Sequence, residues 1–122
     1  FIATADQAIA EGSNCATLRF GHESVVLPLV CLMGLNGMNL STTDLDSVAE
    51  RWQSYKVFPM GANVQWIFYH AEGKPVLVKF LLNEREASLP DAVKPVSGPY
   101  YRWTDAKAYF EQVLAAQPAE GK

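Results

Sequence analysis

The sequence predicts an α/β domain, a small layered sheet with flanking helices in the order α-β-α-α-β-β-α. Two neighbouring segments, 63–69 and 76–82, are rich in aromatic, branched and other apolar residues, as strands are. Before and after them, apolar residues recur at the three- and four-residue spacing of helices that bury one face. The length of 122 residues and the 49% share of hydrophobic residues suffice for one domain, 1–122, with one core.

A helix and a strand are expected at the start of the chain. Ala3 to Glu11 reads as a short helix, closed by the turn residues Gly12-Ser13-Asn14. Ala16 to Phe20 has the alternation of a β-strand, with Leu18 and Phe20 on one face and two polar side chains on the other.

The second helix is expected to begin at Glu23 or Ser24 and to run to Met33. Gly34 directly follows the apolar run and is the expected stop signal. Pro28 is expected near the first turn of this helix, where its missing N–H group costs little.

Two further helices are predicted from cap residues that are followed by an apolar stripe. Ser41-Thr42-Thr43 offers caps for the first of them, with the stripe Leu45, Val48, Ala49 and Trp52. Thr104 offers a cap for the last helix, with the stripe Ala106, Tyr109, Phe110, Val113 and Leu114. Pro118 and the tail after it are expected to end that helix.

The two central strands lack a clean polar face, which predicts a sheet that is covered by helices on both sides. Ala71-Glu72-Gly73-Lys74 is a hairpin-like turn between them, and the three prolines of 88–99 predict a surface loop. So few strands and helices leave apolar sheet faces uncovered. We therefore expect a larger sheet, completed by more of the same protein or by a partner chain.

Composition excludes some functions. A net charge of −3 argues against a broad nucleic-acid surface, which needs clustered Lys and Arg. No segment offers the roughly 18 uninterrupted apolar residues of a membrane span. Cys15 and Cys31 allow at most one disulfide, and the apolar run around Cys31 favours a buried free thiol there. Because the chain begins at Phe1, we expect a mature product or a fragment of a longer protein.

The first candidate site is the pair His22 and Glu23. The expected strand stops at Gly21, and the two titratable groups then stand at the expected start of an apolar helix. The positive end of a helix favours anions such as phosphate, so the order predicts an anion site. In the alternative interpretation, His22 merely caps the helix and Glu23 complements its dipole.

Other residues with chemical potential have plainer interpretations. Ser24 lacks the Gly-x-Ser-x-Gly pattern of an activated serine, which favours helix capping. His70-Ala71-Glu72 is a second histidine–carboxylate set, but it falls at the hairpin turn, which favours a solvated turn. Asn83-Glu84-Arg85-Glu86 reads as a solvated edge, with a ligand-facing loop end as the alternative. The sequence has no glycine-rich phosphate loop and no His/Cys spacing of a metal site.

Together with the elements and candidate residues above, the sequence resembles the C-terminal part of histidine acid phosphatases, in the multiple inositol polyphosphate phosphatase (phytase-like) branch. Four stretches carry the resemblance in the family's order: LRFGHESVVLPLVCLMGL (18–35), FPMGANVQWIFYH (58–70), VLVKFLLNEREASLP (76–90) and YYRWTDAKAYFEQVL (100–114). The resemblance implies that the chain is part of a larger phosphoglycerate-mutase-like α/β fold.

The resemblance also implies an activity. Family members hydrolyse phosphomonoesters, inositol phosphates among them, in two steps without a metal or another cofactor. A histidine of an Arg-His-Gly-x-Arg-x-Pro motif attacks phosphorus, and a later His-Asp or His-Ala-Glu motif binds phosphate and protonates the leaving alcohol. By this resemblance His22 is the phosphate-binding histidine and Glu23 the acid. Export to the periplasm or beyond is a further expectation from the family.

Two departures from the family pattern bear on these expectations. The Arg-His-Gly-x-Arg-x-Pro motif does not occur in this sequence, so we expect the nucleophile in a missing N-terminal segment and an inactive isolated chain. The expected partners are a phosphate or phosphomonoester substrate and that missing N-terminal segment or a second copy of the chain. The order His-Glu-Ser places Ser24, not Glu23, at the position of the Glu in His-Ala-Glu. The alternative is a non-catalytic domain that binds an anion or another protein.

Overall fold

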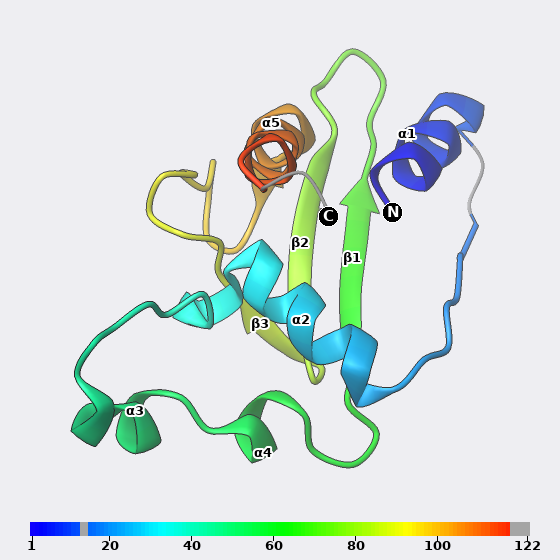
Figure 1. Cartoon of the computed structure of the whole chain (residues 1–122). Helices are drawn as coiled ribbons and strands as arrows, with labels where there is room; N and C mark the ends of the chain where they lie inside the picture. The colour runs from blue at the N-terminus through cyan, green and yellow to red at the C-terminus, as the bar shows by residue number, and fades with distance from the viewer. Residues whose placement is uncertain (13–14, 118–122) are drawn as a thin grey trace.

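The computed structural model describes residues 1–12 and 15–117 (Figure 1). Its helices are α1 (Ile2–Glu11), α2 (Glu23–Met33), α3 (Leu45–Arg51), α4 (Ser54–Val57) and α5 (Trp103–Ala115), with the 3-10 turn η1 (Leu35–Gly37). Its strands are β1 (Val64–Tyr69), β2 (Leu77–Leu82), β3 (Arg85–Ala87) and β4 (Tyr101–Arg102). The mixed α/β class is confirmed. Within the described residues, no helix has the length and apolar character needed to cross a membrane.

The sheet is antiparallel and has β2 at its centre. β1 pairs with the whole of β2, from Val64 opposite Leu82 to Tyr69 opposite Leu77. β3 and β4 are short and both pair with β2. The predicted hairpin is confirmed, with its turn closed where the Lys74 amide donates to the Ala71 carbonyl at 3.1 Å.

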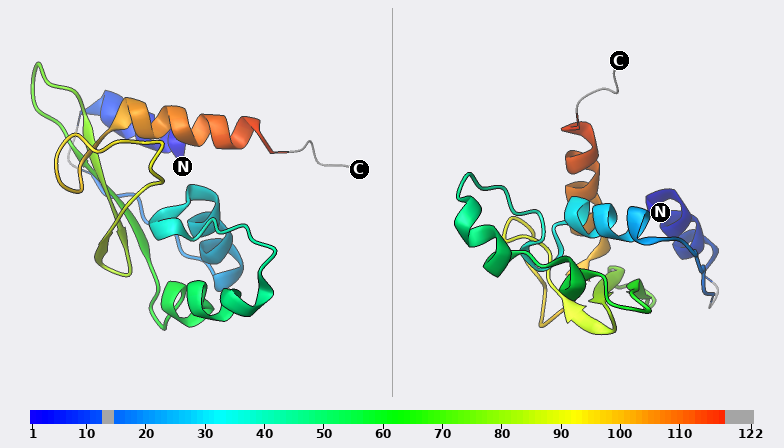
Figure 2. Two further views of the ribbon diagram at one scale, coloured as in Figure 1. Left: turned by 90° about the vertical axis from the view of Figure 1, so that its left-hand side faces the viewer. Right: turned by 60° about the horizontal axis from the view of Figure 1, so that its bottom comes forward.

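The core lies on one face of this sheet. Burial alternates along β2, where Val78, Phe80 and Leu82 are buried and the residues between them are only half-buried. Figure 2 shows that the helices lie on this one side of the sheet. The prediction of helices on both sides is therefore wrong for the described part of the chain. It failed because the other face also carries apolar residues, Ile67, Leu77 and Leu81, which hide the alternation in the sequence.

The predicted strand at 16–20 is also wrong. These residues are exposed and run as an open trace between α1 and α2 (Figure 1), and no strand forms there. A strand requires a neighbour that accepts and donates its backbone hydrogen bonds, and no described segment pairs with these residues.

The predicted loop at 88–99 is buried in part. Leu89 and Val93 are 5% and 6% exposed, so this segment contributes to the core. The helix expected after residue 43 is short and ends at Arg51, before Trp52, and Leu45 of its predicted buried stripe is 79% exposed.

Helix boundaries agree with expectation better than helix caps do. α1 and α2 end as predicted, at Gly12 and Gly34, which have the positive φ angles of 65° and 68° that favour glycine. The N-cap of α3 is Asp44, directly after the predicted cap residues Ser41-Thr42-Thr43. The N-cap of α5 is Arg102, two residues before the predicted cap Thr104. Neither side chain makes a capping hydrogen bond. Pro28 lies in the second turn of α2, not the first. The residues Ser13, Asn14 and Pro118 of the predicted helix ends lie outside the described part of the chain.

A charged contact joins the two ends of the chain. Asp6 of α1 accepts hydrogen bonds from the Trp103 indole at 2.9 Å and from the Lys107 ammonium at 2.6 Å, both on α5. The hydrogen bond from Lys107, and then that from Trp103, holds the pKa of Asp6 below its usual value.

We expect Asp6→Asn to lower the melting temperature at neutral pH, because it removes the charge that Lys107 faces. A carboxylate with a lowered pKa stabilises the fold above its unfolded pKa of about 3.9, and this contribution is lost as the pH falls through the folded pKa. The difference between the two proteins should therefore shrink in acid. Thermal unfolding followed by circular dichroism across pH measures this, with the exposed carboxylate Asp91 as a control in Asp91→Asn.

The turn between β2 and β3 yields a second prediction. Its central residues, Asn83 and Glu84, have positive φ angles of 51° and 66°. Such angles suit Asn and Gly in a two-residue hairpin but strain Glu. Glu84→Gly should therefore raise the free energy of unfolding, by about 0.5–1 kcal/mol. As a control, Glu86→Gly in the regular strand β3 should lower the free energy of unfolding. Denaturant titration of both variants measures the two changes.

Candidate functional site

His22 and Glu23 lie where α2 begins. His22 is the N-cap residue, with extended backbone angles, and its carbonyl accepts hydrogen bonds from the amides of Val25 and Val26 at 2.9 and 3.1 Å. The His22 side chain makes no capping hydrogen bond. His22 therefore stands at the cap position, as the alternative interpretation expects, but the helix uses its backbone and not its imidazole.

Glu23 occupies the first helical position and Ser24 the second, and both are exposed. Glu23 complements the positive end of the helix, as the alternative interpretation expects. Ser24 lies inside the first turn and not at the N-cap, so the capping role expected of it is wrong. The first amides of a helix have no partner within the helix, and they lie beside these two side chains.

The surroundings of this pair are open. Every residue from Cys15 to Val25 is exposed. Neither the groove beside Cys31 nor a second groove beside Val93 includes His22 or Glu23 in its lining. An imidazole, a carboxylate and free helix amides can bind an anion and transfer a proton, but they enclose no substrate.

The second histidine–carboxylate set is far from the first. His70 and Glu72 are exposed in the β1–β2 connection. This connection and the start of α2 lie at opposite ends of the sheet in both Figure 1 and Figure 2. The prediction of a solvated turn agrees with this placement. The described residues include no cluster of three or more His, Cys, Asp or Glu that is arranged to hold a metal.

The segment 83–86 is a structural corner. The Asn83 side chain accepts from the Asn63 amide at 3.1 Å and donates to the Val57 carbonyl at 3.0 Å, which ties the hairpin to α4. The next three residues are exposed. Glu86 lies 3.7 Å from the Lys79 ammonium of β2, and the exposed positions agree with the interpretation of a solvated edge.

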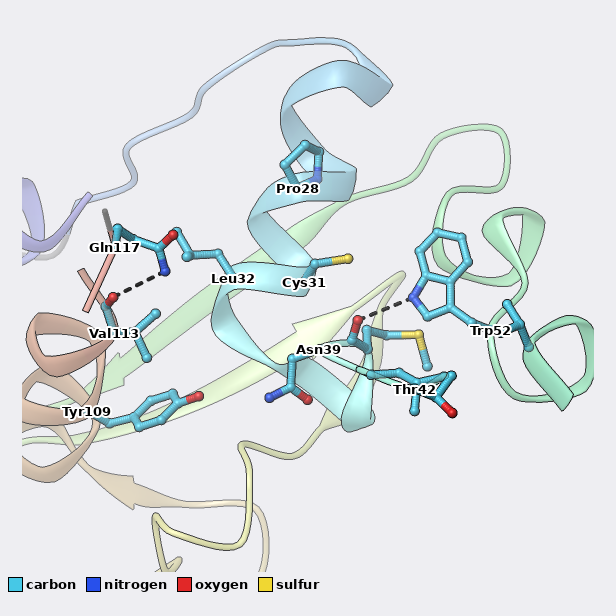
Figure 3. Close-up of a pocket in the computed structure, with 12 residues that line it drawn as sticks. Pro28, Cys31, Leu32, Asn39, Thr42, Trp52, Tyr109, Val113 and Gln117 are labelled. Atoms are coloured by element: carbon cyan, nitrogen blue, oxygen red, sulfur yellow. Dashed lines mark hydrogen bonds between the residues drawn. The ribbon is translucent and has the colours of Figure 1, made fainter. Parts of the chain in front are cut away.

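Sequence reasoning missed a groove of about 740 Å³ between α2, the segment after η1, and α5 (Figure 3). Its wall includes Cys31, Trp52 and Tyr109, and the Trp52 indole donates to the Met38 carbonyl at 3.2 Å. Most of its lining comes from residues 28–52, but one wall comes from residues 109–117 at the other end of the chain, so no local sequence pattern predicts it. Cys31 is a half-buried free thiol, close to the expected buried one, and burial raises its pKa.

No protein-family model matches the chain. Among solved structures, it matches part of a phosphatase with a TM-score of 0.77 and 32% sequence identity. That protein is the multiple inositol polyphosphate phosphatase of Bifidobacterium longum, determined in complex with inositol hexasulfate. The match covers 89% of this chain but only 24% of the phosphatase chain. The resemblance to multiple inositol polyphosphate phosphatases is thereby confirmed, for a chain that spans about a quarter of the protein it matches.

The two thiols should differ in reactivity. Cys15 is exposed, whereas Cys31 is half-buried with a raised pKa, and alkylation requires an accessible thiolate. We expect iodoacetamide to modify Cys15 severalfold faster than Cys31, as measured by mass spectrometry of peptides over time. Cys15→Ser should leave the rate at Cys31 unchanged. Equal rates at the two residues would contradict the half-buried placement of Cys31.

Proposed function

We propose that this chain is the C-terminal segment of a histidine-type phosphatase that hydrolyses phosphomonoesters, inositol phosphates among them. The similarity at 32% identity over 89% of the chain is the observation that carries the proposal. Inositol hexasulfate, bound by the matched phosphatase, carries sulfate esters that stand in for the phosphate esters of an inositol phosphate. The same ligand chemistry suits the exposed imidazole and free helix amides at the start of α2.

In this proposal His22 binds the phosphoryl group. Its imidazole, which makes no capping hydrogen bond, donates to a phosphoryl oxygen, and the first amides of α2 add further donors. Donors fixed in advance stabilise the charge that develops on a phosphoryl group during transfer. The nucleophilic histidine, which the family resemblance implies, comes from a part of the protein outside this chain.

Glu23 is the proposed acid. It donates a proton to the leaving alkoxide oxygen as the phosphorus–oxygen bond breaks, and so the alcohol departs neutral. A positioned acid contributes a factor of about 10²–10⁴ to such a step. The chain alone, which supplies no nucleophile, is expected to release no phosphate.

The test of Glu23 compares two substrates in the protein encoded by the complete reading frame. Phytate has an alkoxide leaving group that needs a proton, whereas an aryl phosphate has a leaving group that departs without one. Glu23→Gln should therefore lower turnover of phytate by a factor of about 10²–10⁴ and turnover of the aryl phosphate much less. Assays of phosphate release at mildly acidic pH measure both.

His22→Ala should lower turnover of both substrates, because phosphate binding is common to them. His70→Ala and Glu72→Gln change the second histidine–carboxylate set, at the opposite end of the sheet, and serve as matched controls with near-normal turnover. Equal losses on both substrates in Glu23→Gln would remove its role as the acid. Absence of phosphate release from the complete protein would favour the alternative, a domain that binds an anion or another protein.

A further inference from the structure

Arg19 ties the segment that leads into His22 to the start of α1. Every residue from Cys15 to Phe20 is exposed, and the segment forms no ladder with the described strands. Arg19 donates to the Thr4 hydroxyl at 2.9 Å, and its guanidinium lies over the Phe1 ring at 4.7 Å from the centroid. One side chain thus connects an otherwise exposed segment to a helix.

α1 is itself fixed to the core, so it can serve as an anchor. Ala5 is buried, and Asp6 accepts the two hydrogen bonds from α5 that are described above. The ring centroids of Phe1 and Trp66 are 6.1 Å apart, so the ring beneath the guanidinium lies against β1. A cation over an aromatic face is attracted by the electrons of the ring. The two partners of Arg19 therefore move with the core and not with the solvent-exposed segment.

The direction of the His22 imidazole depends on how the chain enters α2. His22 is the N-cap residue, with φ −117° and ψ 172°, and the helix holds its carbonyl through the amides of Val25 and Val26. Rotation about the Cα–C bond, the angle ψ, moves the amide nitrogen and the Cβ atom of His22 together, because both are bonded to Cα. Whatever holds the chain before His22 therefore also sets the direction of its imidazole.

Arg19 is close enough in sequence to restrict this rotation. Three residues span at most about 10–11 Å, so a fixed Arg19 limits where the His22 amide can lie. Gly21 lies between the two residues, and a glycine permits many directions of entry. The contacts of Arg19 offset the freedom that Gly21 introduces.

We propose that Arg19 is a positioning residue for the phosphate-binding imidazole of His22. Held by Thr4 and Phe1, it fixes the entry of the chain into α2, and it acts through His22 and not through contact with the phosphoryl group. The proposal rests on the proposed function, in which His22 binds that group. A donor fixed in advance needs no reorganisation during transfer, and a misplacement of about 1 Å costs a factor of about 10² in rate.

Turnover of phytate by the protein of the complete reading frame tests whether Arg19 acts through His22. Arg19→Met keeps an unbranched side chain and removes the guanidinium, and it should lower kcat/KM by a factor of about 10–10². In a His22→Ala background the same change should cost less than about twofold, because no imidazole is left to direct. Equal losses in the two backgrounds overturn the proposal, since they indicate direct contact with substrate or impaired folding.

Arg102→Met is the matched control. Arg102 is exposed and pairs with Leu77 at the start of β2, at the end of the sheet away from α2's first turn. The substitution removes the same charge and should leave turnover near normal.

A second variant tests the anchor on α1. Phe1→Leu combined with Thr4→Val removes both partners and leaves Arg19 itself in place. Because the guanidinium then has nothing on α1 to hold it, this double variant should lose about as much turnover as Arg19→Met. Near-normal turnover in the double variant overturns the proposal.

Histidine NMR of the complete protein provides a readout that needs no activity. The ring resonances of His22, assigned by their loss in His22→Ala, should shift in Arg19→Met and in the α1 double variant, because the surroundings of the ring change. Those of His70, at the opposite end of the sheet, should not shift. Unchanged His22 resonances overturn the proposal. If the complete protein releases no phosphate, the proposed function fails, and the His22 resonances still decide whether Arg19 positions the ring.

Discussion

The packing of Trp66 against Phe80 is the contact on which the rest of this structure depends. Phe80 is fully buried at the centre of β2, and the Trp66 ring lies edge-on to it at 5.7 Å. Trp66 also stacks on Phe110 of α5 at 5.3 Å and contacts Trp103 at 5.9 Å. Aromatic pairs contribute about 0.5–1.5 kcal/mol each beyond the burial of their area. One aromatic cluster therefore joins the β1–β2 hairpin to the last helix.

The parts that the sequence predicts well are those whose signals are local. The strands at 64–69 and 77–82 lie within two residues of their expected bounds, since apolar composition and a turn with a glycine specify a hairpin without help from elsewhere. α2 and its stop at Gly34 are equally local. His22 and Glu23 were placed at the helix start by the same argument, and the structure puts them there.

The failures come from interactions that no local pattern records. Residues 16–20 have the alternation of a strand, but a strand needs a neighbour, and the described chain offers none. Leu89 and Val93 are buried although their segment is rich in proline, because the loop folds back onto the core. Leu45 is exposed although it follows helical spacing, since α3 has no buried residue. The groove at Cys31 arises from segments distant in sequence, as long-range packing requires.

α2 is divided into an anchored half and an exposed half, and this division determines where His22 and Glu23 lie. The C-terminal half of α2 is anchored, with Val30 and Met33 buried in the core. The N-terminal half is open, with Glu23 and Val25 exposed. An α-helix rises about 1.5 Å per residue and is stiff over this length, so the buried half determines where the exposed end lies. The core of this chain thus fixes the position of His22 and Glu23, and in the proposed phosphatase the walls that enclose a substrate come from outside this chain.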